Sequence, residues 1–138
     1  MIQFYFLSVL LNALTGYILS SGSGQKESEG SLERGIDRFL RNDTFRLVLG
    51  LAAMATGLLK LLSSTNGDIP VIGDCIPAVA GLGTGFILVF EYYNARSALN
   101  TEKSEAFARS LEQNKRWVGF IALASAALHF LFPGVLFL

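Results

Sequence analysis

Four long apolar runs alternate with shorter polar stretches along the chain. The runs cover residues 2–19, 45–62, 75–93 and 117–132. Each approaches the roughly 20 residues with which an α-helix crosses the hydrocarbon core of a membrane. A water-soluble helical bundle would show polar residues on every turn, and these runs do not. The pattern predicts an all-α polytopic membrane protein with four transmembrane helices in a single domain.

The polar stretches contain helical periodicity of their own. Residues 31–41 carry charges on one face and, at helical spacing on the other, four apolar side chains: Leu32, Ile36, Phe39 and Leu40. This pattern is typical of a short amphipathic helix that lies on the membrane surface. Two other roles stay open, namely ordering the connection between two spans or docking a partner. We expect a second polar helix over residues 101–116.

The first run needs separate consideration, because small residues follow it as they follow a cleaved signal peptide. No Lys or Arg precedes the run, so the positively charged region with which a signal peptide begins is missing. We therefore interpret residues 2–19 as a first transmembrane helix.

The two halves of the chain match at an offset of 69 residues. Residues 15–19 read Thr-Gly-Tyr-Ile-Leu, and residues 84–88 read Thr-Gly-Phe-Ile-Leu. Overall identity between the halves is low, so convergence of small residues at helix crossings is the alternative explanation. The matching positions favour two tandem helical hairpins with repeat halves 1–69 and 70–138. Such parallel repeats are related by a pseudo-two-fold axis along the membrane normal.

Small residues recur four apart within the apolar runs. Lipid tails are as apolar as leucine, so transmembrane helices associate through close backbone approach, which small residues permit, and through polar side chains. The sequence predicts a tightly packed core with little room for a wide pore. The predicted helix-packing residues are Asn12, Gly16, Ala53, Gly57, Gly81, Gly85, Ala122 and Ala126.

The basic residues predict an orientation. Of the eleven Lys and Arg, four lie between the first and second runs, a fifth (Arg46) stands at the very start of the second run, and five lie between the third and fourth. Cytoplasmic loops carry the excess of these residues. We therefore place residues 20–45 and 94–116 in the cytoplasm and both termini outside. The lack of an organellar transit signal favours the plasma (inner) membrane of a bacterium or archaeon.

Few ionisable residues fall within the apolar runs. Lys60 and His129 lie in the outer halves of the second and fourth runs, and Asp74 lies in the outer connection nearby. Buried charges in a membrane are candidates for functional sites. Lys60, Asp74 and His129 therefore form the candidate polar site, for a substrate or a proton. The other interpretation is that Lys60 snorkels to the surface or pairs locally. Glu91 is expected to pair with Arg96 or with a basic residue near the fourth run.

Composition argues against several classes of function. The net charge is zero and no basic tract suggests nucleic-acid binding. We identify no Ser/His/Asp set around His129, the only histidine, and no Cys or His cluster for a metal. We predict no catalytic residue, cofactor or metal. The sequence favours a non-catalytic scaffold or accessory subunit of a larger membrane assembly. Its expected partners are the lipid bilayer and other membrane subunits or copies of itself. The alternative is a small oligomeric transporter or channel that uses the candidate polar site.

Overall fold

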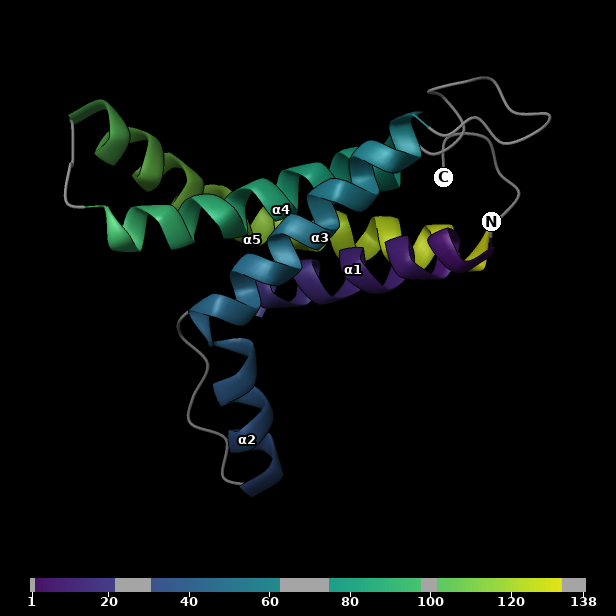
Figure 1. Ribbon diagram of the computed structural model, residues 1–138, viewed down its shortest axis with the longest axis horizontal. Helices are drawn as coiled ribbons and strands as arrows, with labels where there is room; N and C mark the ends of the chain where they lie inside the picture. The colour runs from purple at the N-terminus through teal and green to yellow at the C-terminus, as the bar shows by residue number, and fades with distance from the viewer. Residues whose placement is uncertain (1, 22–30, 63–74, 98–101, 133–138) are drawn as a thin grey trace.

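The computed structural model describes residues 2–21, 31–62, 75–97 and 102–132. The regular structure of these segments is helical throughout, which confirms the all-α class (Figure 1). The helices are α1 (Ile2–Ser21), α2 (Ser31–Leu40), α3 (Asp43–Leu62), α4 (Cys75–Arg96) and α5 (Glu102–Leu131).

Three of the helices are long and apolar enough to cross a membrane. They are the segments Gln3–Ser21, Asp43–Leu62 and Cys75–Arg96, which contain or closely overlap the first three predicted spans. The fourth predicted span, 117–132, lies in the C-terminal half of α5, whose N-terminal half is polar. The fourth crossing therefore stays a prediction.

The polar stretches behave differently in the two halves of the chain. Residues 31–40 form the separate helix α2, as expected from their periodicity. Asn42 then caps α3, because its side-chain oxygen accepts a hydrogen bond from the backbone N–H of Phe45 at 3.1 Å. The second polar helix that we expected is not separate. It continues into the apolar segment as one helix, because no proline stands near Trp117 and the side chain of Asn114 donates to the carbonyl of Ser110 in its own helix instead of capping a new one.

The long helices alternate in direction. Helices α1 and α4 run one way, and α3 and α5 run back (Figure 1). Helix α3 packs mainly on α4, and α1 packs mainly on α5, with smaller contacts between α1 and α4 and within each predicted hairpin. The main packing thus joins the halves 1–69 and 70–138 to each other. The grouping into two tandem hairpins is not confirmed.

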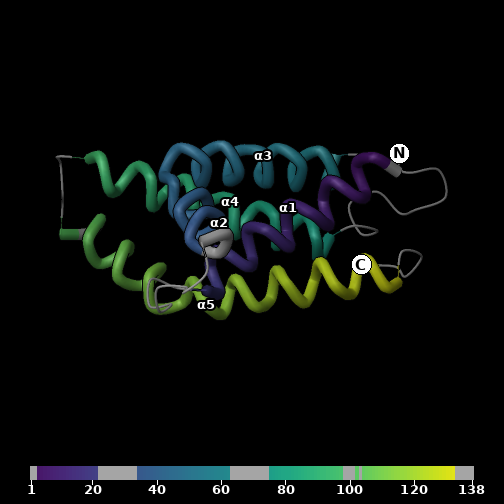
Figure 2. Tube along the Cα trace, turned by 90° about the horizontal axis from the view of Figure 1, so that it is seen from below, coloured from purple at the N-terminus to yellow at the C-terminus, as the bar shows by residue number. Residues whose placement is uncertain are grey.

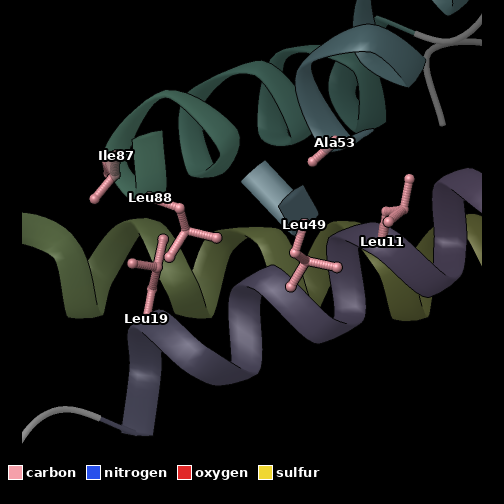
Figure 3. Close-up of a cluster of buried hydrophobic side chains, with 6 residues drawn as sticks. All are labelled: Leu11, Leu19, Leu49, Ala53, Ile87 and Leu88. Carbon is pink, nitrogen blue, oxygen red and sulfur yellow. The ribbon is translucent and has the colours of Figure 1, made fainter. Parts of the chain in front are cut away.

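The interior is made of small and medium-sized residues. A cluster from three helices, drawn in Figure 3, consists of Leu11, Leu19, Leu49, Ala53, Ile87 and Leu88. Among the described residues, nine polar side chains are also buried, while large apolar side chains such as Leu10, Val48, Val79 and Phe120 are exposed. Water-soluble proteins bury their large apolar residues instead. This distribution fits helices that are surrounded by lipid.

Candidate functional site

The buried polar residues come from all four long helices. They are Ser8, Asn12, Thr15, Ser20, Thr56, Lys60, Thr84, Ser125 and His129. Lipid tails cannot hydrogen-bond a polar group, so buried polar residues generally find partners within the protein, although the hydroxyl of Ser125 has none among the described residues. Their contacts define two levels of polar interaction along the bundle, and a partly buried ionic cluster forms a third.

The first level joins two of the three predicted site residues. Lys60 of α3 is 8% exposed and His129 of α5 is 1% exposed. The ammonium Nζ of Lys60 lies 2.9 Å from Nε2 of the imidazole, although the residues are 69 positions apart. Lys60 therefore does not snorkel to the surface but pairs locally. Asp74, the third predicted member, lies outside the described residues.

Tyr5 of α1 also belongs to this level, and no pattern in the sequence pointed to it. Its hydroxyl donates a hydrogen bond to the backbone oxygen of His129 at 2.5 Å. Its ring lies 4.7 Å from the imidazole between centroids, and the Lys60 ammonium lies 5.9 Å from the centre of the tyrosine ring. An aromatic face at this distance attracts a cation. Tyr5 therefore holds the imidazole and contributes to the environment of Lys60.

The chemistry of the Lys60–His129 contact is restricted. A hydrogen bond between two basic nitrogens needs a lone pair on one of them. Either a lysine ammonium donates to a neutral imidazole, or an imidazole N–H donates to a neutral amine. The contact therefore holds one proton between the two nitrogens. It is suited to proton exchange or to binding an anion.

The second level lies where α1 and α4 meet. The hydroxyl oxygens of Thr15 and Thr84 are 2.9 Å apart, and these residues are also separated by 69 positions. Each hydroxyl also approaches a backbone oxygen of its own helix, one turn earlier, at 2.8 and 2.9 Å. A hydroxyl has one hydrogen, so one threonine donates across the helices while the other donates to its own helix.

Asn12 supports the same crossing one turn away. Its Nδ2 donates a hydrogen bond to the backbone oxygen of Pro77 at 2.9 Å.

We expect Asn12→Ala to lower the free energy of unfolding by about 0.6–2 kcal/mol, the range for polar contacts between membrane helices. The matched control is Asn114→Ala, because Asn114 is exposed and donates to a carbonyl of its own helix. Unfolding in mixed detergent micelles, followed by circular dichroism, measures both. An equal loss in the two variants would contradict the assignment.

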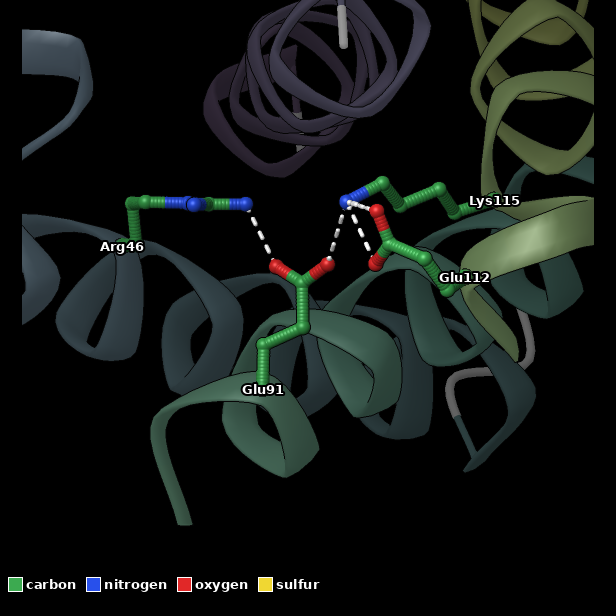
Figure 4. A network of polar contacts seen from close by, with 4 residues as sticks. All are labelled: Arg46, Glu91, Glu112 and Lys115. Atoms are coloured by element: carbon green, nitrogen blue, oxygen red, sulfur yellow. Dashed lines mark hydrogen bonds and ion pairs between the residues drawn. The ribbon is translucent and has the colours of Figure 1, made fainter. Parts of the chain in front are cut away.

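The third level is an ionic cluster at the opposite end of α3 from Lys60. The carboxylate of Glu91 on α4 accepts hydrogen bonds from Arg46 of α3 at 2.5 Å and from Lys115 of α5 at 3.1 Å (Figure 4). Lys115 also forms an ion pair with Glu112 at 2.7 Å. Lys115 is one of the basic residues near the fourth run, as expected, whereas Arg96 instead contacts Tyr92. Arg46 and Lys115 correspond under the 69-residue offset. The 69-residue offset is therefore the feature of the sequence that relates these two partners of Glu91 to each other.

The charges of this cluster shift the titration of Lys115. Burial lowers the pKa of Lys115, but the hydrogen bonds and charges of Glu112 and Glu91 outweigh burial and raise the pKa above its ordinary value. The resulting stabilisation is fully present below the ordinary lysine pKa of about 10.4. It is lost as the pH rises through the higher value of the folded protein.

Glu91→Gln tests the ionic cluster. The change leaves two partly buried cations without their shared carboxylate, so we expect a loss of roughly 1–3 kcal/mol, between the values for exposed and buried pairs. Glu105→Gln is the control, because its pair with Arg109 is exposed and 3.8 Å long. Unfolding between neutral pH and about pH 11 should also show a smaller alkaline loss of stability in Glu91→Gln. Indistinguishable variants would show that Glu91 does not tie the helices together.

The predicted helix-packing residues all lie in the interior. Asn12, Ala53, Ala122 and Ala126 are at most 2% exposed, and the four glycines are also buried. A Cβ added at Gly16 would lie 2.8 Å from the carbonyl oxygen of Gly119, and one at Gly85 would lie 2.5 Å from that of Gly50. The α1–α5 and α3–α4 crossings are therefore direct backbone contacts. Within the described segments, no group of three or more His, Cys, Asp or Glu could hold a metal ion.

Comparison with known proteins places this helical unit in a family. A family model matches residues 1–129. A protein of Treponema pallidum (strain Nichols), which bears the name "Uncharacterized protein", is 37% identical over 138 residues and is covered over its whole length, as is this chain. The chain belongs to the family of this treponemal protein. The family match spans all three polar levels. No solved structure matches the chain significantly.

Proposed function

We propose that the chain is a small integral membrane protein that acts as a non-catalytic scaffold or accessory subunit of a larger membrane assembly. The observation that supports this most strongly is the pair of glycine crossings, where backbones touch and leave no space for a substrate path between α1 and α5 or between α3 and α4. The exposed apolar side chains on the long helices offer a surface to lipid and to neighbouring membrane helices.

In this proposal α5 supplies a fourth span and the two halves are copies of one hairpin. Three contacts support the duplication. Lys60 contacts its offset partner His129, Thr15 contacts Thr84, and Arg46 and Lys115 share Glu91. A two-fold axis along the membrane normal would bring each of these pairs together. In this arrangement each helix of one hairpin packs mainly on a helix of the other hairpin, so each half depends on the other for its packing.

The proposed orientation puts the ionic cluster at the cytoplasmic side of the inner membrane and both termini outside. The projecting ends of α4 and α5 support a role in contacting other subunits there. They border an open groove, which is lined by Phe90, Glu91, Asn94, Ala108, Arg109, Leu111 and Glu112. The groove combines apolar and charged groups, as the surfaces of non-obligate interfaces do.

A photo-crosslinking experiment tests the scaffold proposal. A photoreactive amino acid replaces Ala108, which lines the groove. In the control protein it replaces Ser110, which is exposed on α5 two residues away. In the native host we expect a discrete crosslinked membrane protein from Ala108 only, and we expect that protein to fall in abundance when the gene is deleted. Crosslinks to lipid alone, together with unchanged abundance of all other membrane proteins, would overturn the proposal.

The second candidate function is an oligomeric transporter or channel. The buried Lys60–His129 contact favours it, because a membrane interior rarely holds a basic pair that serves no function. Four helices with direct backbone crossings do not enclose a path, so this function would need several copies of the chain. Substitutions at Lys60 and His129 separate the two candidates.

A further inference from the structure

Helix α2 has an orientation unlike that of the long helices. In Figure 1 it runs across the long direction of the bundle, and in Figure 2, seen from below, it points toward the viewer. It is attached where α1 ends and α3 begins, the end of the bundle that holds the Arg46–Glu91 ion pair. If the long helices cross a bilayer, α2 lies parallel to the membrane plane.

The two faces of α2 differ in chemistry. Ile36 is 61% exposed and Phe39 is 57% exposed, although both are large and apolar. Phe39 packs against Phe45 at 4.1 Å between ring centroids, so this face of α2 is continuous with α3. Arg34, Arg38 and Arg41 lie on the opposite side of the helical turn. Residues 31–41 hold three arginines against two acidic residues, so the segment is net positive.

The corresponding segment of the second half behaves differently. Residues 102–109 stand 69 positions after residues 33–40, yet they continue without a break into α5. The break in the first half comes from Asn42, which caps α3 and corresponds to Leu111. The chain thus uses a capping residue to turn α2 away from the axis of α3. Because of this turn, α2 runs across the long direction of the bundle. If α2 instead continued the axis of α3 out of the membrane, the apolar side chains of Ile36 and Phe39 would face water.

We propose that α2 is an interfacial helix that binds the anionic leaflet of the membrane. Ile36 and Phe39 enter the region between headgroups and acyl chains. Arg41 pairs with Asp37 at 2.9 Å, so Arg38 and the net positive charge of the segment meet the acidic phospholipid headgroups. An amphipathic helix of this kind buries its apolar face about 5–10 Å into the boundary and draws further affinity from basic residues near anionic lipid. The proposal rests on the proposed function, in which the long helices α1, α3, α4 and α5 cross a bilayer, and it adds a specific lipid contact.

Site-specific labelling of the full-length protein tests the proposal. Cys75 is the sole cysteine, so Cys75→Ser gives a background in which single cysteines can carry the fluorophore NBD. The test position is Ile36→Cys, the polar-face control is Asp37→Cys, and Phe120→Cys reports the exposed surface of α5. The proteins are reconstituted in nanodiscs of phosphatidylethanolamine and phosphatidylglycerol that contain a doxyl-labelled lipid quencher.

We expect loss of fluorescence at Ile36→Cys comparable with that at Phe120→Cys, and little loss at Asp37→Cys. Replacing phosphatidylglycerol by phosphatidylcholine should reduce the quenching at Ile36→Cys and leave that at Phe120→Cys unchanged. Quenching at Phe120→Cys with an unquenched, water-accessible Ile36→Cys would overturn the α2 proposal alone. An Ile36→Cys label protected from both lipid and water would also overturn it, by indicating that a second copy covers the face. Failure of quenching at Phe120→Cys would contradict the membrane placement of α5 itself.

Discussion

Gly85→Ala is expected to destabilise the protein strongly, although alanine favours helices more than glycine does. The added Cβ would lie 2.5 Å from the carbonyl oxygen of Gly50 and 3.0 Å from the backbone nitrogen of Met54. Both neighbours are backbone atoms and cannot rotate away, so α3 and α4 must separate. Overpacking of this kind costs about 1–3 kcal/mol, and Gly85→Leu should cost more. The expected loss is among the largest for any single substitution in the chain.

The chain offers a matched control on the same helix. Gly83 stands two residues away on α4, and a Cβ built there meets no atom within 4 Å. Gly83→Ala should therefore be neutral, or should stabilise the protein by up to about 1 kcal/mol through helix propensity. Unfolding by sodium dodecyl sulfate in mixed micelles, followed by circular dichroism, gives both values. If Gly83→Ala and Gly85→Ala lose the same stability, the α3–α4 crossing is not a backbone contact.

The other main crossing provides an independent repetition of the test. A Cβ at Gly16 would lie 2.8 Å from the oxygen of Gly119 and 2.9 Å from the backbone nitrogen of Leu123. Gly16 and Gly85 are 69 positions apart, and so are Gly50 and Gly119. We expect Gly16→Ala to cost about as much as Gly85→Ala, in the same range of about 1–3 kcal/mol. Similar losses would support the proposed duplication, because equivalent positions would carry equivalent packing.

The sequence was most informative where the membrane limits the structure. The predicted spans over residues 2–19, 45–62 and 75–93 agree with three apolar helices, because bilayer thickness sets the length of an apolar helix. Glycine and alanine spacing located residues that are buried, since close backbone approach requires small side chains. The amphipathic helix α2 was also predictable, because its four apolar residues leave one face charged.

The sequence was less informative about which helices pack together. An offset of 69 residues identifies equivalent positions, but it does not say whether α1 packs mainly on α3 or on α5. That choice depends on helix crossings that are far apart in the chain. The contact of Tyr5 with His129 was unpredictable for the same reason. Glu91 was expected to have a basic partner, but its two partners from α3 and α5 require the complete arrangement of helices.

Substituting both members of the Lys60–His129 pair is expected to do less damage than substituting either one. His129→Leu leaves the buried ammonium of Lys60 without the nitrogen that lies 2.9 Å away, so we expect a loss of about 2–4 kcal/mol. Lys60→Met removes the charge and should cost less. The double variant replaces both polar groups by apolar ones of similar size, and its stability should return to within about 1 kcal/mol of the unaltered protein. Unfolding of all four proteins gives the coupling free energy directly.

The same four proteins separate the two candidate functions, because stability and activity are measured on one set of variants. In proteoliposomes with an internal pH indicator and a potassium diffusion potential, a scaffold gives no proton flux with or without the pair. In the native host, the stable double variant should also restore the abundance of the partner proteins that a gene deletion lowers. Proton flux in the unaltered protein that disappears in the well-folded double variant would instead assign the pair to transport. A pair held only for structure can be replaced by apolar groups without functional loss, whereas one that carries a proton cannot, since methionine and leucine offer no site for it.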